Sequence, residues 1–145
     1  MIIGFHEGVS EGDADARESI IDQLHITMDT DNDSEGATDP WKIDDGFDNY
    51  IWGTKNYNGS NIYAWNHPDF TLAEISINNR PFLLNMTNGG TAQDRSNPYG
   101  NHTTTVIGYR EGGEVFELYD TYDSQSHYLT WGSWTACSYT KVTTS

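Results

Sequence analysis

Alternation of apolar and polar residues predicts a β-hairpin between residues 103 and 119, and the other candidate features lie around it. The segments Thr103–Tyr109 and Glu114–Tyr119 are rich in β-branched and aromatic residues and are joined through glycines. Because a hairpin folds back on itself, Asp120, after the second strand, is expected opposite residues 103–105. At the spacing of neighbouring strands this places it within ~3–10 Å of His102, which precedes the first strand.

Side-chain alternation decides whether His102 and Asp120 share a face of this hairpin. An even register places them together, and a three-residue loop at Glu111–Gly113 gives that register. A two-residue Gly-Gly turn would separate them. The apolar residues on the shared face would be Val106, Phe116 and Leu118. An imidazole with a carboxylate behind it is the orienting half of a nucleophilic triad. From spacing alone the simpler alternative stays open: a strand-start histidine and a turn aspartate with no joint role.

Helical patterns occupy the first half of the chain and strand patterns the second. The predicted helices are Asp13–Met28, a second that begins at Asp39 and Pro40 and stops at Gly53, and a short third that Thr71 and Glu74 cap. The predicted strands besides the hairpin are Ile62–Trp65, Phe82–Met86, Tyr128–Trp131 and Ala136–Val142. The helix residues expected to be buried are Ile20, Ile21, Leu24, Met28, Ile43, Phe47, Tyr50 and Ile51. Asn56–Asn61 is expected to be a loop.

This order of elements indicates an α+β fold with helices packed on an antiparallel sheet. The 145 residues are expected to form a single domain, in which residues 1–80 are mainly helical and residues 81–145 form the sheet. Trp and Tyr supply much of the apolar surface for its core, because 13% of the residues are aromatic.

The charge of the chain restricts its partners. Asp and Glu number 22 against seven Lys and Arg, which gives a formal net charge of −15. Nucleic acids and anionic membrane surfaces would repel such a chain, so neither is expected as a partner. Its acidity suits a protein of the extracellular space or of salty water, and we expect an extracellular, secreted protein. No apolar run approaches the ~20 residues that cross a bilayer.

Metal and cofactor sites are not expected. The one cysteine, Cys137, excludes an internal disulfide and a cysteine-based zinc site. Asp29, Asp31 and Asp33 alternate as oxygen ligands do in a calcium loop, but the sixth and twelfth positions hold Ser34 and Pro40 instead of glycine and glutamate. The segment is interpreted as a solvated acidic loop, with adventitious calcium binding as the alternative, and no metal site and no cofactor are expected.

The chain resembles the C-terminal portion of papain-like cysteine peptidases, nearest to their C39-like bacterial branch. The resemblance rests on an ordered set of short motifs: Met28-x-Thr30, Asp45-Gly46-Phe47 with Asn49-Tyr50, Arg80-Pro81, and His102 ahead of Val106-Ile107-Gly108-Tyr109, then Asp120. It implies a papain-like fold that hydrolyses peptide bonds in peptide or protein substrates. It also implies that His102 is the general base and that Asp120 orients it.

The family carries its nucleophilic cysteine on a helix ahead of these elements, and no cysteine precedes Cys137. Cys137, among small residues of a late strand, is interpreted as a buried structural residue. The alternative is a rearranged site that uses Cys137, which would require its strand to approach His102. The papain-like portion is therefore expected to be incomplete, inactive as an isolated chain, and prone to bind an N-terminal partner segment or to self-associate. Three possibilities remain: a part of a peptidase, a non-catalytic binding module with the same fold, or an unrelated acidic α+β domain.

Overall fold

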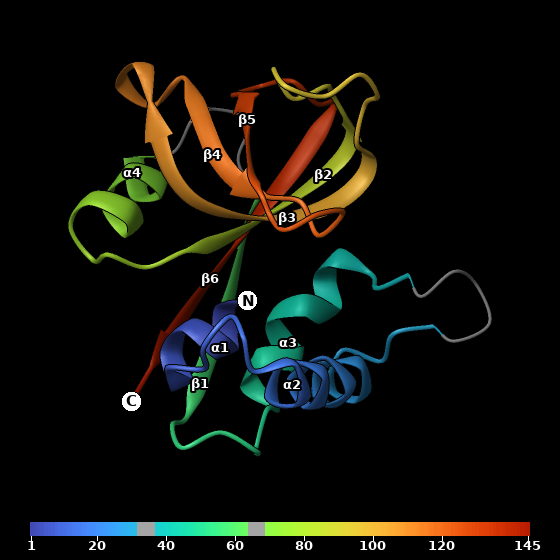
Figure 1. Ribbon diagram of the computed structural model, residues 1–145, viewed down its shortest axis with the longest axis vertical. Helices are drawn as coiled ribbons and strands as arrows, with labels where there is room; N and C mark the ends of the chain where they lie inside the picture. The colour runs from blue at the N-terminus through green and yellow to red at the C-terminus, as the bar shows by residue number, and fades with distance from the viewer. Residues whose placement is uncertain (32–36, 64–68) are drawn as a thin grey trace. The chain divides into compact units, whose positions relative to one another are not determined.

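The computed structural model describes residues 1–31, 37–63 and 69–145 (Figure 1). Their contacts separate into two compact units. Unit 1 comprises Met1–Asn61 and Thr140–Ser145, and unit 2 comprises Ile62–Tyr139. Helices and an antiparallel sheet together make the structure α+β, as the sequence predicts.

Unit 1 contains short helices. They are α1 (Ile2–Glu7), α2 (Ala14–Thr27), the 3-10 turn η1 (Pro40–Lys42) and α3 (Ile43–Asp48). The Asp13 carboxylate caps α2 by accepting the Ala16 N–H at 3.0 Å, so this helix begins where the sequence predicts. In the same unit the Glu7 carboxylate accepts hydrogen bonds from Thr54 and Tyr57. Those bonds, led by the Thr54 hydroxyl, lower the pKa of Glu7 to about 2.

Within the described part of the chain, six strands form one sheet in the order β1-β6-β2-β3-β4-β5. They are β1 (Tyr57–Tyr63), β2 (Phe82–Gly89), β3 (Gly100–Arg110), β4 (Val115–Tyr119), β5 (Ser126–Thr130) and β6 (Ala136–Thr144). The predicted hairpin is confirmed, because β3 and β4 pair antiparallel and are joined by the 3-10 turn η2 (Glu111–Gly113). The helix α4 (Asp69–Ser76) precedes β2. In Figure 1 the strands of unit 2 curve strongly, with long β3 sweeping past β2 and β4.

A β-bulge sets the register between β3 and β4. Next to the turn the pairing is odd, with Arg110 opposite Val115, and after the bulge at Ile107 it is even, with Val106 opposite Leu118. Because Arg110 pairs with Val115, the unpaired loop holds four residues, Glu111–Glu114, and not the expected three, so the turn by itself gives an odd register. The bulge restores the even register, and His102 and Asp120 keep the alternation that places them on the Val106 face.

That face carries the core of unit 2. The fully or nearly fully buried residues of the core are Phe82, Leu84, Met86, Ala92, Tyr99, Val106, Phe116, Leu118, Leu129 and Tyr139. At ~1.5–3 kcal/mol for each large buried side chain, this cluster is the main stabilising contribution in the unit. Within residues 1–31, 37–63 and 69–145, the helices are too short or too polar to span a bilayer.

Several sequence-based expectations for the helices are wrong. The second helix ends at Asp48, not at Gly53, and Ile51 beyond it is 79% exposed. On α2, Ile20 is buried but Ile21 is 62% exposed, so the apolar stripe there is narrower than its periodicity indicates. The third helix starts at Asp69, which places Thr71 inside α4 and not at its cap. The side chain of Glu74 instead pairs with Arg80 at 2.9 Å.

The segment Asn56–Asn61, expected to be a loop, lies mostly in β1. Gly59 passes so close to the backbone of Asp44 that a Cβ atom would lie 2.4 Å from its carbonyl oxygen. Glycine here therefore permits close packing, whereas the sequence pattern indicates a flexible loop. The predicted strand Ile62–Trp65 overlaps the end of β1, and its residues 64 and 65 lie outside the described residues. Residues 32–36 of the acidic segment compared with a calcium loop also lie outside the described residues.

Candidate functional site

His102 lies near the start of β3, opposite Met86 of β2, and is half-buried. Its Nε2 lies 2.6 Å from the backbone carbonyl oxygen of Asp120. A carbonyl only accepts hydrogen bonds, so Nε2 must carry the proton, and in the neutral ring the lone pair is on Nδ1. Nδ1 makes no hydrogen bond to another described residue. His102 therefore presents a fixed tautomer with an available basic nitrogen.

Two tyrosines hold the plane of the His102 ring. Tyr122 stacks on it with ring centroids 4.7 Å apart and an interplanar angle of 9°, and Tyr99 stacks at 5.6 Å and 12°. Tyr99 is buried, whereas Tyr122 is 59% exposed. Stacking of this kind limits ring rotation, which keeps Nε2 directed at the carbonyl.

The Asp120 carboxylate does not face His102. It is fully buried, and its Oδ2 accepts hydrogen bonds from Arg95 Nη1 and from the Tyr99 hydroxyl, both at 2.9 Å. Burial raises the pKa of Tyr99, and the hydrogen bond to Asp120 raises it further. The two sequence-predicted residues are thus brought together, but through the backbone of Asp120. The carboxylate has another task, which is to fix that backbone.

The turn after β4 is held in a strained conformation. Thr121 has φ = 72°, in the left-handed region that β-branched residues rarely adopt, at a cost of roughly 1–3 kcal/mol. The two residues that flank Thr121 are hydrogen-bonded to each other, because Asp120 Oδ1 accepts the Tyr122 N–H at 3.0 Å. The buried carboxylate therefore locks both its own carbonyl and the stacked Tyr122. Such strain persists only where surrounding contacts determine the backbone, as they do here.

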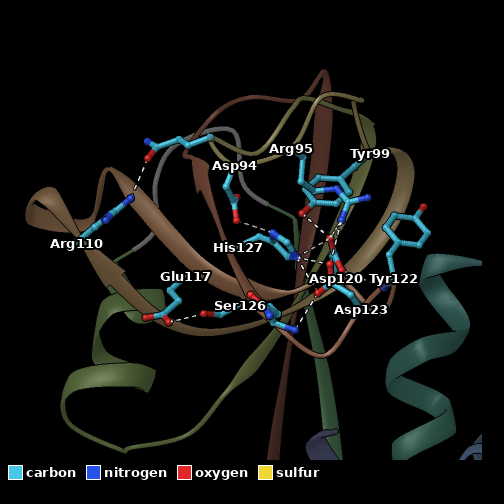
Figure 2. Close-up of polar contacts among 12 residues, drawn as sticks. Asp94, Arg95, Tyr99, Arg110, Glu117, Asp120, Tyr122, Asp123, Ser126 and His127 are labelled. Carbon is cyan, nitrogen blue, oxygen red and sulfur yellow. Dashed lines mark hydrogen bonds and ion pairs between the residues drawn. The ribbon is translucent and has the colours of Figure 1, made fainter.

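A second histidine lies beside this turn. His127 on β5 is 6% exposed, and its Nδ1 is 2.7 Å from Asp94 Oδ2 while its Nε2 is 3.0 Å from Asp123 Oδ1. Asp120 Oδ2 is 3.6 Å from the same Nε2. Figure 2 shows the His127 ring between Asp94 on one side and Asp120 and Asp123 on the other, with Arg95 reaching Asp120.

These contacts shift three pKa values. Burial by itself lowers the pKa of His127, but hydrogen bonds to Asp123 and Asp94 and the nearby charge of Asp120 outweigh it, so the pKa is raised. Burial is the largest single effect on Asp94 and raises its pKa, but hydrogen bonds from His127 and from backbone N–H groups, together with the charge of His127, outweigh burial, so the pKa is lowered. The pKa of Asp123 is lowered, first by the Gln125 backbone N–H and then by His127.

A metal ion would have to compete with a cation already present. Asp120, Asp123 and His127 each offer one possible metal-ligand atom, and these atoms lie within 4.8 Å of one another. Among the described residues, this is the cluster of acidic and histidine side chains that could hold a metal ion. However, Arg95 Nη1 lies 2.9 Å from Asp120 and 3.7 Å from Asp123. Its guanidinium supplies the positive charge between the two carboxylates, so the arrangement fits an ion-pair network better than a metal centre.

Cys137 is not placed as a nucleophile for His102. It lies on β6, which β2 separates from β3, and two strand spacings amount to ~9–10 Å. Burial raises the pKa of its thiol, although hydrogen bonds with Tyr139 and Trp134 act in the opposite direction. A reactive cysteine needs a lowered thiol pKa, so Cys137 has the environment of a structural residue.

No protein family, curated protein or solved structure was found to match this chain. The site is therefore described by its own geometry. Sequence reasoning missed the residues around Asp120, which are Asp94, Arg95, Tyr99, Tyr122, Asp123 and His127. The short spacing between Asp120 and His127 could have indicated that they are neighbours. If the strand after the turn pairs antiparallel with β4, His127 lies opposite Leu118 and therefore beside the end of β4, as the structure shows.

Proposed function

We propose that this chain supplies the histidine–aspartate part of the catalytic site of a papain-like cysteine peptidase, with the thiol provided by a segment or chain other than the one described. The observation that carries the proposal is the His102–Asp120 contact. Nε2–H donates to a fixed acceptor, and Nδ1 is left as the base that could receive a proton from a thiol.

The hairpin geometry supports a papain-like assignment. His102 near the start of β3 and Asp120 directly after β4 are adjacent strand ends on one face of an antiparallel sheet that follows helices in the chain. The orienting group is a carbonyl held by a buried carboxylate, and a fixed dipole can orient an imidazole as a carboxylate does. In this proposal the Asp120 carboxylate acts on the base indirectly.

The test compares the isolated chain with the chain extended by whatever sequence its gene encodes ahead of Met1. The isolated chain is expected not to hydrolyse fluorogenic peptides. The extended chain is expected to hydrolyse them, to lose activity with iodoacetamide, and to lose about 10³-fold or more in His102→Ala, the order seen for loss of a catalytic base. Cys137→Ser serves as the matched thiol control and should remain active.

Two outcomes would contradict the proposal. If the extended chain is inactive and gains no thiol that iodoacetamide labels faster than Cys137, the peptidase assignment fails. If the isolated chain is active and Cys137→Ser abolishes that activity, Cys137 is the nucleophile and the arrangement proposed here is wrong.

A binding module is the second candidate, favoured by an aromatic cavity in unit 2. The cavity has a volume of about 350 Å³ and is lined by Tyr63, Trp131, Trp134 and Cys137, among others. Trp131 and Trp134 meet edge to face at 5.9 Å. Such a cavity fits a small apolar side chain. Tryptophan fluorescence titration with short peptides tests this function: binding that His102→Ala retains and Trp134→Ala abolishes would favour it.

A further inference from the structure

The two nitrogens of His127 both point at carboxylates. Asp94 and Asp123 have lowered pKa values, so at neutral pH each presents only hydrogen-bond acceptors. Both ring nitrogens must then donate, and a ring that donates from both nitrogens is an imidazolium. His127 is thus a buried cation between two acids, with 2.7 and 3.0 Å contacts.

This cation joins two segments that meet at His102. Asp94 belongs to the connection between β2 and β3, from which Arg95 and Tyr99 also extend, whereas Asp123 belongs to the turn between β4 and β5. Arg95 spans the same two segments through Asp120 and Asp123 (Figure 2). The strained turn is therefore fastened to the β2–β3 connection by two positive charges.

We propose that His127, as an imidazolium, is a positioning residue for His102, because it holds the Asp120–Asp123 turn in the arrangement in which the Asp120 carbonyl meets the His102 ring. The term positioning rests on the proposed function, in which His102 is the base. The physical coupling between the two histidines does not depend on that function.

The charge balance explains why one proton matters. The charged groups that face the ring are Asp94 from the β2–β3 connection and Asp120 and Asp123 from the turn, while Arg95 neutralises part of that charge. Leu118, opposite His127 on β4, is apolar. Loss of the His127 proton leaves three carboxylates facing one guanidinium. Repulsion between Asp120 and Asp123 then acts on the strained Thr121 between them.

The direction with pH follows from the sign of the shift. A raised folded-state pKa means that the contribution of His127 is fully present below ~6.5 and is lost as pH rises through the higher folded value. The lowered pKa values of Asp94 and Asp123 mean that their contributions persist above ~3.9 and are lost only in stronger acid. The turn is therefore expected to be firm in mild acid and to loosen on the alkaline side.

The test is a pH titration by NMR of the whole chain with ¹⁵N-labelled histidine. Both His127 ring nitrogens are expected to be protonated at pH 6. When pH rises through the His127 midpoint, the ring signals of His102 should shift at the same midpoint. The Tyr122 amide, which donates to Asp120, should then exchange with solvent about tenfold faster.

Variants separate coupling from general destabilisation. In His127→Gln the His102 step at that midpoint should vanish, whereas His25→Gln, on α2 in unit 1, controls for the loss of one histidine. Asp94→Asn should lower the His127 midpoint by about one pH unit and move the His102 step with it, because one of two ion-pair partners is lost. Asp22→Asn, exposed on α2, is its matched control and should move neither.

Three results would overturn the proposal. The first is a wild-type titration in which His127 changes protonation and His102 and the Tyr122 amide do not respond; this result stands even if His127→Gln fails to fold. The second is a variant Asp94→Asn in which the His127 midpoint moves but the His102 ring signals still shift at the wild-type pH. The third is stoichiometric binding of added Zn²⁺ to the His127 ring. An inactive extended chain with intact coupling would instead count against the peptidase alone.

Discussion

Two histidines of unit 2, His102 and His127, contact the same turn, Asp120–Asp123, but have different surroundings. His102 has one nitrogen hydrogen-bonded to a backbone carbonyl, two tyrosine rings stacked against its ring, and one nitrogen available. His127 is buried, with acids at both nitrogens. The first ring can change its protonation without breaking a contact, whereas the second cannot. Proton chemistry is therefore expected at His102 and electrostatic cross-linking at His127.

Asp120 connects the two by dividing its groups between them. Its carbonyl contacts His102, and its carboxylate is buried near His127 and Arg95. Because the buried carboxylate fixes the backbone of Asp120, the carbonyl that contacts His102 is held rigidly. A carboxylate that contacted His102 directly would lie at the end of a rotatable side chain. His102 is thus served by the backbone carbonyl of Asp120, and His127 lies near its side-chain carboxylate.

The largest expected effect is the loss of stability in His127→Ala. Removing the buried cation leaves Asp94, Asp120 and Asp123 without their shared positive charge. The free energy of unfolding should fall by about 3 kcal/mol, the lower end of the range for buried pairs, because Asp94 and Asp123 are partly exposed. His102→Ala is the matched control and should cost about 1 kcal/mol, for one hydrogen bond and its stacking. Urea unfolding followed by circular dichroism measures both. Equal costs would remove the distinction between the two histidines.

The next effect is a pH dependence that only one histidine accounts for. Because the folded-state pKa of His127 is raised, the free energy of unfolding should fall as pH rises above ~6.5, by at most about 1.4 kcal/mol per pH unit from this group. Subtracting the curve for His127→Gln from that of the wild type isolates this slope. A difference curve that is flat from pH 6 to 9 would mean that the two acids do not hold His127 as a cation.

A smaller effect sharpens the role of the strained turn. Asn tolerates the left-handed region better than a β-branched residue, so Thr121→Asn should raise the free energy of unfolding by about 0.5–1 kcal/mol. The control Thr91→Asn changes an exposed threonine outside the turn and should have little effect. If Thr121→Asn destabilises the chain, the surrounding contacts do not store strain in this backbone.

The hairpin could be predicted because its information is local. The β-rich runs on either side of Gly112 and Gly113 define the two strands, and the parity of His102 and Asp120 defines their shared face. The bulge at Ile107 was beyond such reasoning, since nothing in the alternation marks one residue as unpaired. The sequence thus predicts the correct face of the sheet for His102 and Asp120, but it assigns the even register to the turn, whereas the bulge at Ile107 produces it.

The network around His127 could not be predicted from pattern. It requires three separate segments to meet, and the positions of Asp94 and Arg95 depend on a connection without regular structure. The role of the Asp120 carboxylate was missed for the same reason, because its partners come from that connection. On the helices, periodicity predicted burial of Ile21 and Ile51, but burial depends on what packs against a helix and not on its pattern alone.

The most direct test of the account is the position of the proton on His102. Long-range ¹H–¹⁵N spectra of the neutral ring should show a proton on Nε2 that exchanges slowly with solvent and lies close to Tyr122, with Nδ1 unprotonated. In urea the same proton should exchange rapidly, which controls for the intrinsic preference of the ring. A proton on Nδ1, or an Nε2 proton that exchanges equally fast in the folded and unfolded chain, would contradict the claim that Asp120 holds His102 ready as a base.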